Sequence, residues 1–270
     1  MYNIKDNVVL VTGGAAGIGA GIVKAFLEGG AKHVAALDID VVKGMAFEND
    51  QALIHGSDRI KFYKCDVTTN ELDACYDNII KKYGYIDVVV NNAGIMNDSP
   101  NVYLKEIEIN VTALIKSSLK AYELIRKDRG GRGGAIINIS SIVGISRVAT
   151  LPVYTATKSA VLQFSNCLGM NHHYNRSDVR VITICFGCTD TTLFSNTKMG
   201  AIDKETESLL EPGYKNLPMQ TLESAVKGLI YAYQHGASAS TWLVTSNRPA
   251  EDITNNVTKA YEVMGQGILL

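Results

Sequence analysis

The chain lacks the features of a membrane-bound, secreted or nucleic-acid-binding protein. No apolar run approaches the ~20 residues that a spanning helix needs, and the first apolar run begins at Val8, too early to leave room for a signal peptide. With 26 Lys and Arg against 27 Asp and Glu, the net charge is −1, so no basic surface for nucleic acid or an anionic membrane is expected. We therefore expect a cytoplasmic protein with neither kind of partner.

Cysteine chemistry is also weakly supported. The five cysteines are scattered and odd in number, which fits reduced thiols. Cys185 and Cys188 form a C-x-x-C pair, but a zinc site needs four ligands and no second pair accompanies them. We expect no bound metal, whereas a redox role of this pair stays open because the sequence does not test it.

The amino-terminal segment has the pattern of a phosphate-binding turn. Residues 8–12 are almost entirely apolar, as in a strand buried on both faces. They lead directly into Gly13, Gly14, Gly17 and Gly19, and helical periodicity follows from Ala20. Such a turn presents backbone N–H groups and the positive end of a helix to a pyrophosphate, and missing Cβ atoms allow close approach. The pattern therefore predicts a dinucleotide site.

The next apolar run, residues 33–38, ends in Asp38, about 20 residues beyond the glycines, as expected of a ribose-binding acid. This carboxylate would accept hydrogen bonds from both adenosine ribose hydroxyls and would repel a 2′-phosphate. Ile39 and Asp40 follow, and the glycine turn contains no Arg or Lys, which favours NAD over NADP. The alternative is a solvated aspartate at a strand end.

Strand and helix patterns alternate along the rest of the chain. Further strands are expected at residues 60–65, 86–91, 135–139, 179–184 and 241–245, and helices at about 69–83, 102–127, 153–174 and 222–235. This alternation predicts an α/β fold, a single-domain Rossmann-type doubly wound parallel sheet of about seven strands with helices on both faces, over residues 1–270.

Two segments fall outside the alternation. Residues 188–220 have the composition of a long irregular loop at the carboxyl end of a strand, where ligands bind in such sheets, and are expected to form a substrate lid. Residues 246–270 are expected to form a C-terminal tail that covers the site or a neighbouring subunit. The long helices 102–127 and 153–174 would be the contact faces of a homodimer or homotetramer.

Tyr154 and Lys158 stand four residues apart on one face of an expected helix. A free tyrosine keeps its proton to pH ~10, and a cation beside it favours the phenolate. Lowering its pKa by about three units takes roughly 4 kcal/mol of differential interaction. The pair therefore suggests a tyrosine general base, and the alternative is an ordinary buried tyrosine beside a solvated lysine.

Together these residues resemble the short-chain dehydrogenase/reductase family over nearly the whole chain. The motifs are Thr12-Gly13-x3-Gly17-x-Gly19, Asp66-Val67, Asn91-Asn92-Ala93-Gly94, Asn110, Ser140-Ser141 and Tyr154-x3-Lys158. The family's catalytic serine stands thirteen residues before the tyrosine, which selects Ser141. The resemblance implies metal-independent hydride transfer between an alcohol and NAD, with Asn110, Ser141, Tyr154 and Lys158 as catalytic residues.

The resemblance also implies the residues that surround cofactor and substrate. The expected cofactor contacts are Gly13, Ala16, Gly17, Ile18, Gly19, Asp38, Ile39, Asp66, Val67, Asn91, Ala93, Gly94, Tyr154, Lys158, Gly187, Thr189 and Thr191. The expected substrate pocket is formed by Ile95, Ser141, Val143, Val148, Leu151, Phe186 and Leu193. Nearly all of these pocket residues are apolar, which favours a small hydrophobic alcohol or ketone as substrate.

Within the family the chain resembles the insect-type alcohol dehydrogenases and the 15-hydroxyprostaglandin dehydrogenases. Phe186 stands where the family usually has proline, and Leu151 stands where prostaglandin-type members have glutamine. A primary or secondary alcohol is therefore favoured as substrate, and a hydroxysteroid or 15-hydroxyprostaglandin remains an alternative. An NADP-dependent carbonyl reductase and a non-catalytic NAD-binding sensor also remain open.

Overall fold

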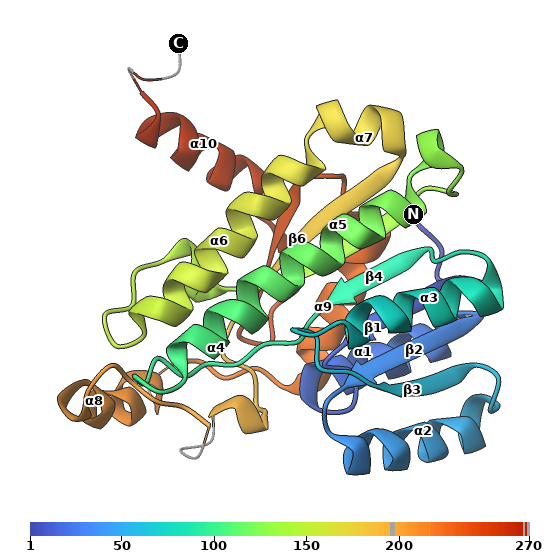
Figure 1. The fold of residues 1–270 in the computed structure, drawn as a ribbon. Coiled ribbons are helices and arrows are strands. Elements are labelled where there is room, and N and C mark those ends of the chain that lie inside the picture. Colours follow the sequence, from blue (N-terminus) through green and yellow to red (C-terminus); the bar gives the residue numbers. More distant parts are fainter. Residues whose placement is uncertain (195–197, 216, 267, 269–270) are drawn as a thin grey trace.

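The computed structural model describes residues 1–194, 198–215, 217–266 and 268. Its centre is an eight-stranded sheet in the order β3-β2-β1-β4-β5-β6-β7-β8 (Figure 1). The strands are β1 (Val8–Thr12), β2 (His33–Asp38), β3 (Ile60–Lys64), β4 (Val88–Asn91), β5 (Gly134–Ser141), β6 (Val179–Phe186), β7 (Ser240–Val244) and β8 (Glu251–Asp252). The first seven strands are parallel and β8 pairs antiparallel with β7. The expected doubly wound fold is confirmed.

Helices cover both faces of this sheet. One face carries α1 (Gly17–Glu28), α2 (Val41–His55) and α9 (Leu222–His235), and the other carries α3 (Glu71–Tyr83), α5 (Leu114–Ile125) and α6 (Pro152–Gly169). The remaining helices are α4 (Tyr103–Ile107), α7 (Asn171–Ser177), α8 (Lys204–Lys215) and α10 (Thr254–Met264). Within the described ranges, none of these helices combines the length and apolar character needed to cross a bilayer.

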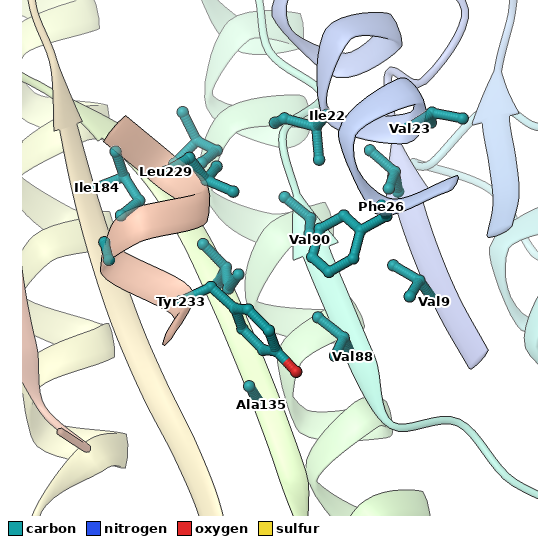
Figure 2. Close-up of a cluster of buried hydrophobic side chains, with 14 of the residues drawn as sticks. Val9, Ile22, Val23, Phe26, Val88, Val90, Ala135, Ile184, Leu229 and Tyr233 are labelled. Atoms are coloured by element: carbon teal, nitrogen blue, oxygen red, sulfur yellow. The ribbon is translucent and has the colours of Figure 1, made fainter. Parts of the chain in front are cut away.

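The strands β1, β2, β4, β5 and β6 are buried along almost their whole length because each serves two cores. Val9 and Val11 of β1 face the layer of α1 and α9, and Val8 and Leu10 face the layer of α3 and α5. Figure 2 shows the first layer, where Phe26 of α1 and Tyr233 of α9 meet above Val88 and Val90 of β4. Removing both faces of the sheet from water supplies the main driving force for this fold.

A polar network ties the sheet to the helices on the second face. The buried Asn138 side chain of β5 accepts hydrogen bonds from Asn91 Nδ2 (2.9 Å) and Ser118 Oγ (3.1 Å) and donates to Ser165 Oγ (2.9 Å). Asn91 Oδ1 in turn accepts from Ser117 Oγ at 2.6 Å. This network fixes β4, β5, α5 and α6 relative to one another, since an unpaired buried amide is costly.

The structure corrects several expected boundaries. The helix expected over residues 102–127 consists of α4, a π-helical turn (Glu108–Ala113) and α5. The helix expected to reach residue 174 ends at Gly169, because Met170 is extended, and α7 follows. Residues 188–220 are less irregular than expected since they contain α8, and the tail contains β8 and α10. Residues 195–197 and 216 of the expected lid, and residues 267 and 269–270 of the expected tail, lie outside the described residues.

We predict that Asn138→Ala destabilises the fold by about 2–3 kcal/mol, because it leaves buried amide and hydroxyl groups without a partner. Urea unfolding monitored by circular dichroism measures this loss. Asn255→Ala, on the exposed surface of α10, is the control and should change stability by less than about 0.5 kcal/mol. Equal stabilities of the two variants would contradict a structural role of the network.

Candidate active site

The glycine turn joins β1 to α1 and depends on missing side chains. Gly13 and Gly17 have positive φ values of +64° and +52°, which favour glycine. A Cβ on Gly19 would lie 1.9 Å from the Gly13 carbonyl oxygen, so Gly19 lets the helix start pass close to the turn. Ala16, the N-cap residue of α1, has no side chain that could accept a hydrogen bond from the helix, and the first turn of α1 contains no acidic residue. Its N–H groups are therefore available to an anion.

A cleft runs from this turn along the carboxyl edge of β2, β1 and β4. It is lined by Gly13, Ala16, Gly17, Ile18, Asp38, Ile39, Asp66, Val67, Ala93, Gly94 and Thr191, all of them expected cofactor contacts. Asp38 stands at the end of β2, where its Oδ2 accepts from Ala15 N (3.1 Å) and its Oδ1 from Asp40 N (3.1 Å). These bonds hold the Asp38 carboxylate at the cleft and leave acceptor capacity for further donors.

The Asp66 carboxylate is held by its own turn. Its Oδ1 accepts from Thr68 N (3.0 Å) and Thr68 Oγ1 (2.7 Å), and these bonds hold the pKa of Asp66 below its usual range. Lys105 Nζ approaches Asp66 Oδ2 to 3.9 Å and donates to Thr68 Oγ1 at 2.7 Å. Asp66 thus lines the cleft as a charged, oriented acceptor.

Two of the expected cofactor contacts, Gly19 and Asn91, line neither the cleft nor the cavity that adjoins it. The Asn91 side chain is consumed by the buried network around Asn138, which supports its structural alternative. Gly19 serves the close passage of α1 behind Gly13. Thr12 and Asn92 belong to the motifs but were not among the expected cofactor contacts, and they shape the cleft: Thr12 Oγ1 accepts from Asn92 N (3.0 Å) and Ala93 N (3.1 Å).

Ser141, Tyr154 and Lys158 come together at the carboxyl ends of β5 and β6. Ser141 ends β5, while Tyr154 and Lys158 lie one turn apart on α6. Tyr154 is 7% and Lys158 5% exposed. Lys158 Nζ donates to the Ile139 carbonyl at 3.1 Å and lies 5.5 Å from the centroid of the Tyr154 ring. The phenol and the ammonium therefore share one small volume, as their spacing predicts.

Asn110 joins this group through the π-helical turn. It is 1% exposed, its Nδ2 donates to the Ile95 carbonyl (2.9 Å) and to Thr157 Oγ1 (3.2 Å), and its Oδ1 accepts from Ile95 N (2.9 Å). A Cβ on Gly94 would lie 3.1 Å from Asn110 Oδ1 and 3.6 Å from Lys158 Nζ. Asn110 and Lys158 thus meet across Gly94, and α4, the π turn and α6 are fixed to the segment after β4.

The electrostatics differ from the simplest expectation. Burial raises the pKa of Tyr154 above its ordinary value; the Glu106 carboxyl acts in the same direction, and a hydrogen bond with Ser141 opposes both. Burial also lowers the pKa of Lys158 to about 8. The expected lowering of the tyrosine pKa by Lys158 is absent from the protein alone. The reason is geometric: Lys158 Nζ is bonded to Ile139 O and faces the ring, while desolvation disfavours the phenolate.

An apolar cavity of about 320 Å³ opens beside Tyr154 and adjoins the cleft at Ile18, Gly94, Ile95 and Thr191. All the expected pocket residues line it, namely Ile95, Ser141, Val143, Val148, Leu151, Phe186 and Leu193. Lys158, Gly187, Thr189 and Tyr154 line the same cavity. Phe186 continues β6 by pairing with Val244, so this residue forms a cavity wall inside a regular strand.

Sequence reasoning missed the part of this cavity that α8 and Met96 supply. Leu210 of α8 and Met96 are buried in one cluster with Leu151, Tyr154 and Met199. The signals for α8 were Asp203, whose Oδ1 accepts from Thr206 N (2.7 Å), and acidic residues in the first turn. Pro212 and Gly213 inside the helix obscured its periodicity.

A clasp closes the two ends of residues 188–220. Gln220 N donates to the Cys188 carbonyl (2.8 Å), Asp190 N donates to the Gln220 carbonyl (3.0 Å), and Gln220 Nε2 donates to Thr189 Oγ1 (3.0 Å). This arrangement anchors Thr189 at the cavity, and Met199, Leu210, Gly213 and Leu217 of the same segment also line the cavity. The placement suits the lid expected for this segment.

Metal and redox roles gain no support from the cysteines. Cys185 and Cys188 are buried and free, and burial raises the pKa of both thiols. Cys188 lines the cavity. In the part of the chain that the structure describes, no three His, Cys, Asp or Glu side chains form a group suited to a metal ion.

Comparison with known proteins places this geometry in a family. The family model described as short chain dehydrogenase matches residues 7–201. Alcohol dehydrogenase 1 of Ceratitis cosyra is 39% identical over 144 residues, which are 53% of this chain and 55% of that protein. The 15-hydroxyprostaglandin dehydrogenase (NAD+) of Mus musculus is 32% identical over 195 residues, 72% of this chain and 71% of that protein. The chain therefore spans about half the length of the insect relative that it matches.

Among solved structures, 3-ketoacyl-(acyl-carrier-protein) reductase from Brucella melitensis, complexed with NADH, has a TM-score of 0.75 and 20% sequence identity. The match covers 90% of this chain and 98% of that one, which confirms the fold. The resemblance inferred from the motifs is confirmed by the family match and by the two curated relatives. With most of its length matched in this way, the chain belongs to the short-chain dehydrogenases, a family of oxidoreductases.

Proposed function

We propose that the chain catalyses the NAD-dependent interconversion of a hydrophobic alcohol and its ketone or aldehyde, with Tyr154 as acid–base catalyst. The observation that carries the proposal is the position of Tyr154, which lies with Ser141 and Lys158 where the apolar cavity adjoins the cleft. A proton-transfer group at that junction can reach a substrate oxygen while the substrate carbon faces a dinucleotide.

The residues of the cleft fit NAD. The glycine turn offers an open approach to a pyrophosphate, since even a Cβ on Gly17 would meet only Thr191, at 3.6 Å. Asp38 presents its carboxylate where an adenosine ribose would lie, and the same charge would oppose the 2′-phosphate of NADP. The relative from Mus musculus carries NAD+ in its name and the Brucella melitensis structure contains NADH.

Bound NAD would supply the hydride acceptor. The side chains of the chain then handle the substrate oxygen and its proton. Tyr154 takes the hydroxyl proton during oxidation and returns it during reduction, and Ser141 donates a hydrogen bond to the same oxygen. Lys158, with a pKa of about 8, is largely cationic at neutral pH and stabilises the phenolate once it forms. Asn110 fixes the segment at Gly94 against which Lys158 lies.

The cavity favours an uncharged, apolar substrate. Its walls include Val143, Val148, Leu151, Met199 and Leu210, and Lys158 is its one ionisable side chain besides Tyr154 and Cys188 among the described residues. Lys158 Nζ donates to Ile139 O and faces the Tyr154 ring, and no other cationic side chain among the described residues lines the cavity to bind a substrate carboxylate. This argues for aliphatic or alicyclic alcohols and against hydroxy acids. It also disfavours the carboxylate-bearing 15-hydroxyprostaglandins, although a curated relative carries that name.

A non-catalytic NAD sensor is the remaining candidate of another class. Such a protein would need the cleft but would have no use for Ser141, Tyr154 and Lys158 buried together beside an apolar cavity. Their joint placement therefore supports an enzyme.

We predict that Tyr154→Phe lowers kcat/KM for alcohol oxidation by about 10²–10⁴-fold, because the phenyl ring has no proton to exchange. NADH formation over a panel of apolar alcohols measures turnover, and calorimetry measures NAD binding, which should change little. Tyr231→Phe, at a half-exposed position on α9, is the control and should behave as the parent protein. Turnover by the Tyr154 variant at the parent rate would refute the assignment.

We further predict that Asp38→Asn narrows the preference for NAD over NADP by about 10–100-fold, since the charge that repels the 2′-phosphate is removed. Dissociation constants of both cofactors, determined by tryptophan or NADH fluorescence, give the ratio. The matched control is Asp50→Asn on the exposed surface of α2, which should leave the ratio unchanged. A parent protein that binds NADP more tightly than NAD would overturn the role given to Asp38.

A further inference from the structure

Two carboxyl groups are buried directly behind Tyr154. Asp98 lies in the segment after β4 and is 1% exposed, and Glu106 lies on α4 and is fully buried. α4 packs against the amino-terminal part of α6, which carries Tyr154 (Figure 1). Neither carboxyl group lines the cleft or the cavity, and the mechanism above gives neither a role.

Burial raises the pKa of Asp98, but hydrogen bonds from the backbone of Val153 and Tyr154 oppose this rise, so Asp98 is better placed than Glu106 to carry the charge of the pair. Its Oδ2 accepts from Val153 N at 2.6 Å and its Oδ1 from Tyr154 N at 3.0 Å, so it caps the first turn of α6 from a different segment. Asp98 N also donates to the Gly200 carbonyl at 2.8 Å, beside the lid residue Met199. The same residue therefore holds both the catalytic helix and the segment that covers the cavity.

Glu106 has one oxygen that the ionised form leaves unsatisfied. Its Oε1 accepts from Asn97 N at 3.1 Å, whereas its Oε2 is buried without a donor in the described part of the chain. The carboxyl groups of Glu106 and Asp98 act on each other's pKa, so they lie close together. A proton on Glu106 Oε2 would satisfy this atom by donation to Asp98, whose oxygens already accept from two helix N–H groups. The unpartnered Oε2 and the capping role of Asp98 therefore favour a pair that holds one proton, on Glu106.

The surroundings support this protonation state. Burial, followed by the charge of Asp98, raises the pKa of Glu106 to about 8. The facing charged or titratable groups are Asp98 from the segment after β4 and Tyr154 and Lys158 from α6. Lys158 acts in the opposite direction to Asp98, and it does not outweigh burial.

We propose that Glu106 is a positioning residue that shares one proton with Asp98, and that loss of this proton at alkaline pH weakens the catalytic arrangement around Tyr154. The inference rests on the proposed function, in which Tyr154 must ionise. An ionised Glu106 would repel Asp98, the cap of α6, and would place a second negative charge near the forming phenolate. Both effects oppose turnover.

The first test is thermal stability, which needs no activity. The unfolded chain loses the Glu106 proton near the ordinary pH of 4.5, whereas the folded chain keeps it until about pH 8. The contribution of this proton to the free energy of unfolding is therefore fully present below pH 4.5 and is lost as pH rises to about 8. Glu106→Gln keeps the shape, replaces the O–H donor of the carboxyl group by an amide N–H donor and cannot ionise. We expect the Tm of Glu106→Gln minus that of the parent to rise by about 3–8 °C over this window and to stay level above it.

The second test is the pH profile of kcat/KM for alcohol oxidation. Below pH 8 the parent and Glu106→Gln should coincide, because Glu106 is neutral in both. At pH 9–10 the variant should be about 3–10-fold more active, since only the parent carries the opposing charge. If Glu106→Gln does not fold, Glu106→Met replaces it in both tests. Glu28→Gln, at the exposed end of α1, is the control, and its Tm and kcat/KM should follow those of the parent at every pH.

The two tests distinguish the shared proton, the positioning role of Glu106 and the proposed function. A Tm difference that does not vary with pH overturns the shared proton. A pH-dependent Tm difference with coincident kinetic profiles overturns the positioning role. If the parent turns over no alcohol, the proposed function fails instead, and the pH dependence of the Tm difference still decides whether the pair shares a proton.

Discussion

The burial of the parallel sheet on both faces is the constraint on which the rest of the structure depends. With α1 and α9 on one side and α3, α5 and α6 on the other, the polar groups that can meet a ligand lie at the ends of the strands. The carboxyl ends of all seven parallel strands lie on the same side of the sheet. Residues far apart in the sequence therefore meet there, namely the glycine turn after β1, Asp38 at the end of β2 and Ser141 at the end of β5. The site is a consequence of the layering.

The same burial sets the chemical problem of the site. In the proposed mechanism Tyr154 must lose a proton where desolvation opposes its charged form, and Lys158 beside it lies where desolvation opposes its own charge. An isolated phenolate there would be unstable, so its formation must be tied to the presence of other charges at the junction of cleft and cavity. In this mechanism Tyr154 would keep its proton in the empty protein and would act as a base only when cofactor and substrate are bound.

The sequence predicts this fold well where apolar residues recur with the period of a strand or helix. It predicts poorly where a single tertiary contact decides what a side chain does. The apolar strands and the order of Gly13, Asp38, Ser141 and Tyr154 define the sheet and its edge. The helix α2 carried little signal because its apolar residues Val42, Leu53 and Ile54 are exposed. The use of Asn91 could not be decided from its motif, since the amide serves the cleft or the strands depending on where Ser117, Ser118 and Asn138 lie in space.

Glu106 illustrates why electrostatics are the hardest part to obtain from sequence. Beside the exposed Glu108, it has the appearance of one more acidic residue on a solvated helix, and only the π turn and the contact of α4 with α6 bury it. Once buried, its carboxyl must either find a cation or keep its proton. The cation within reach, Lys158, favours the ionised carboxyl less than burial and Asp98 oppose it, so the proton is retained and the neutral carboxyl supports the helix that carries Tyr154. Backbone geometry thereby decides the charge state of a residue that composition alone would count as an anion.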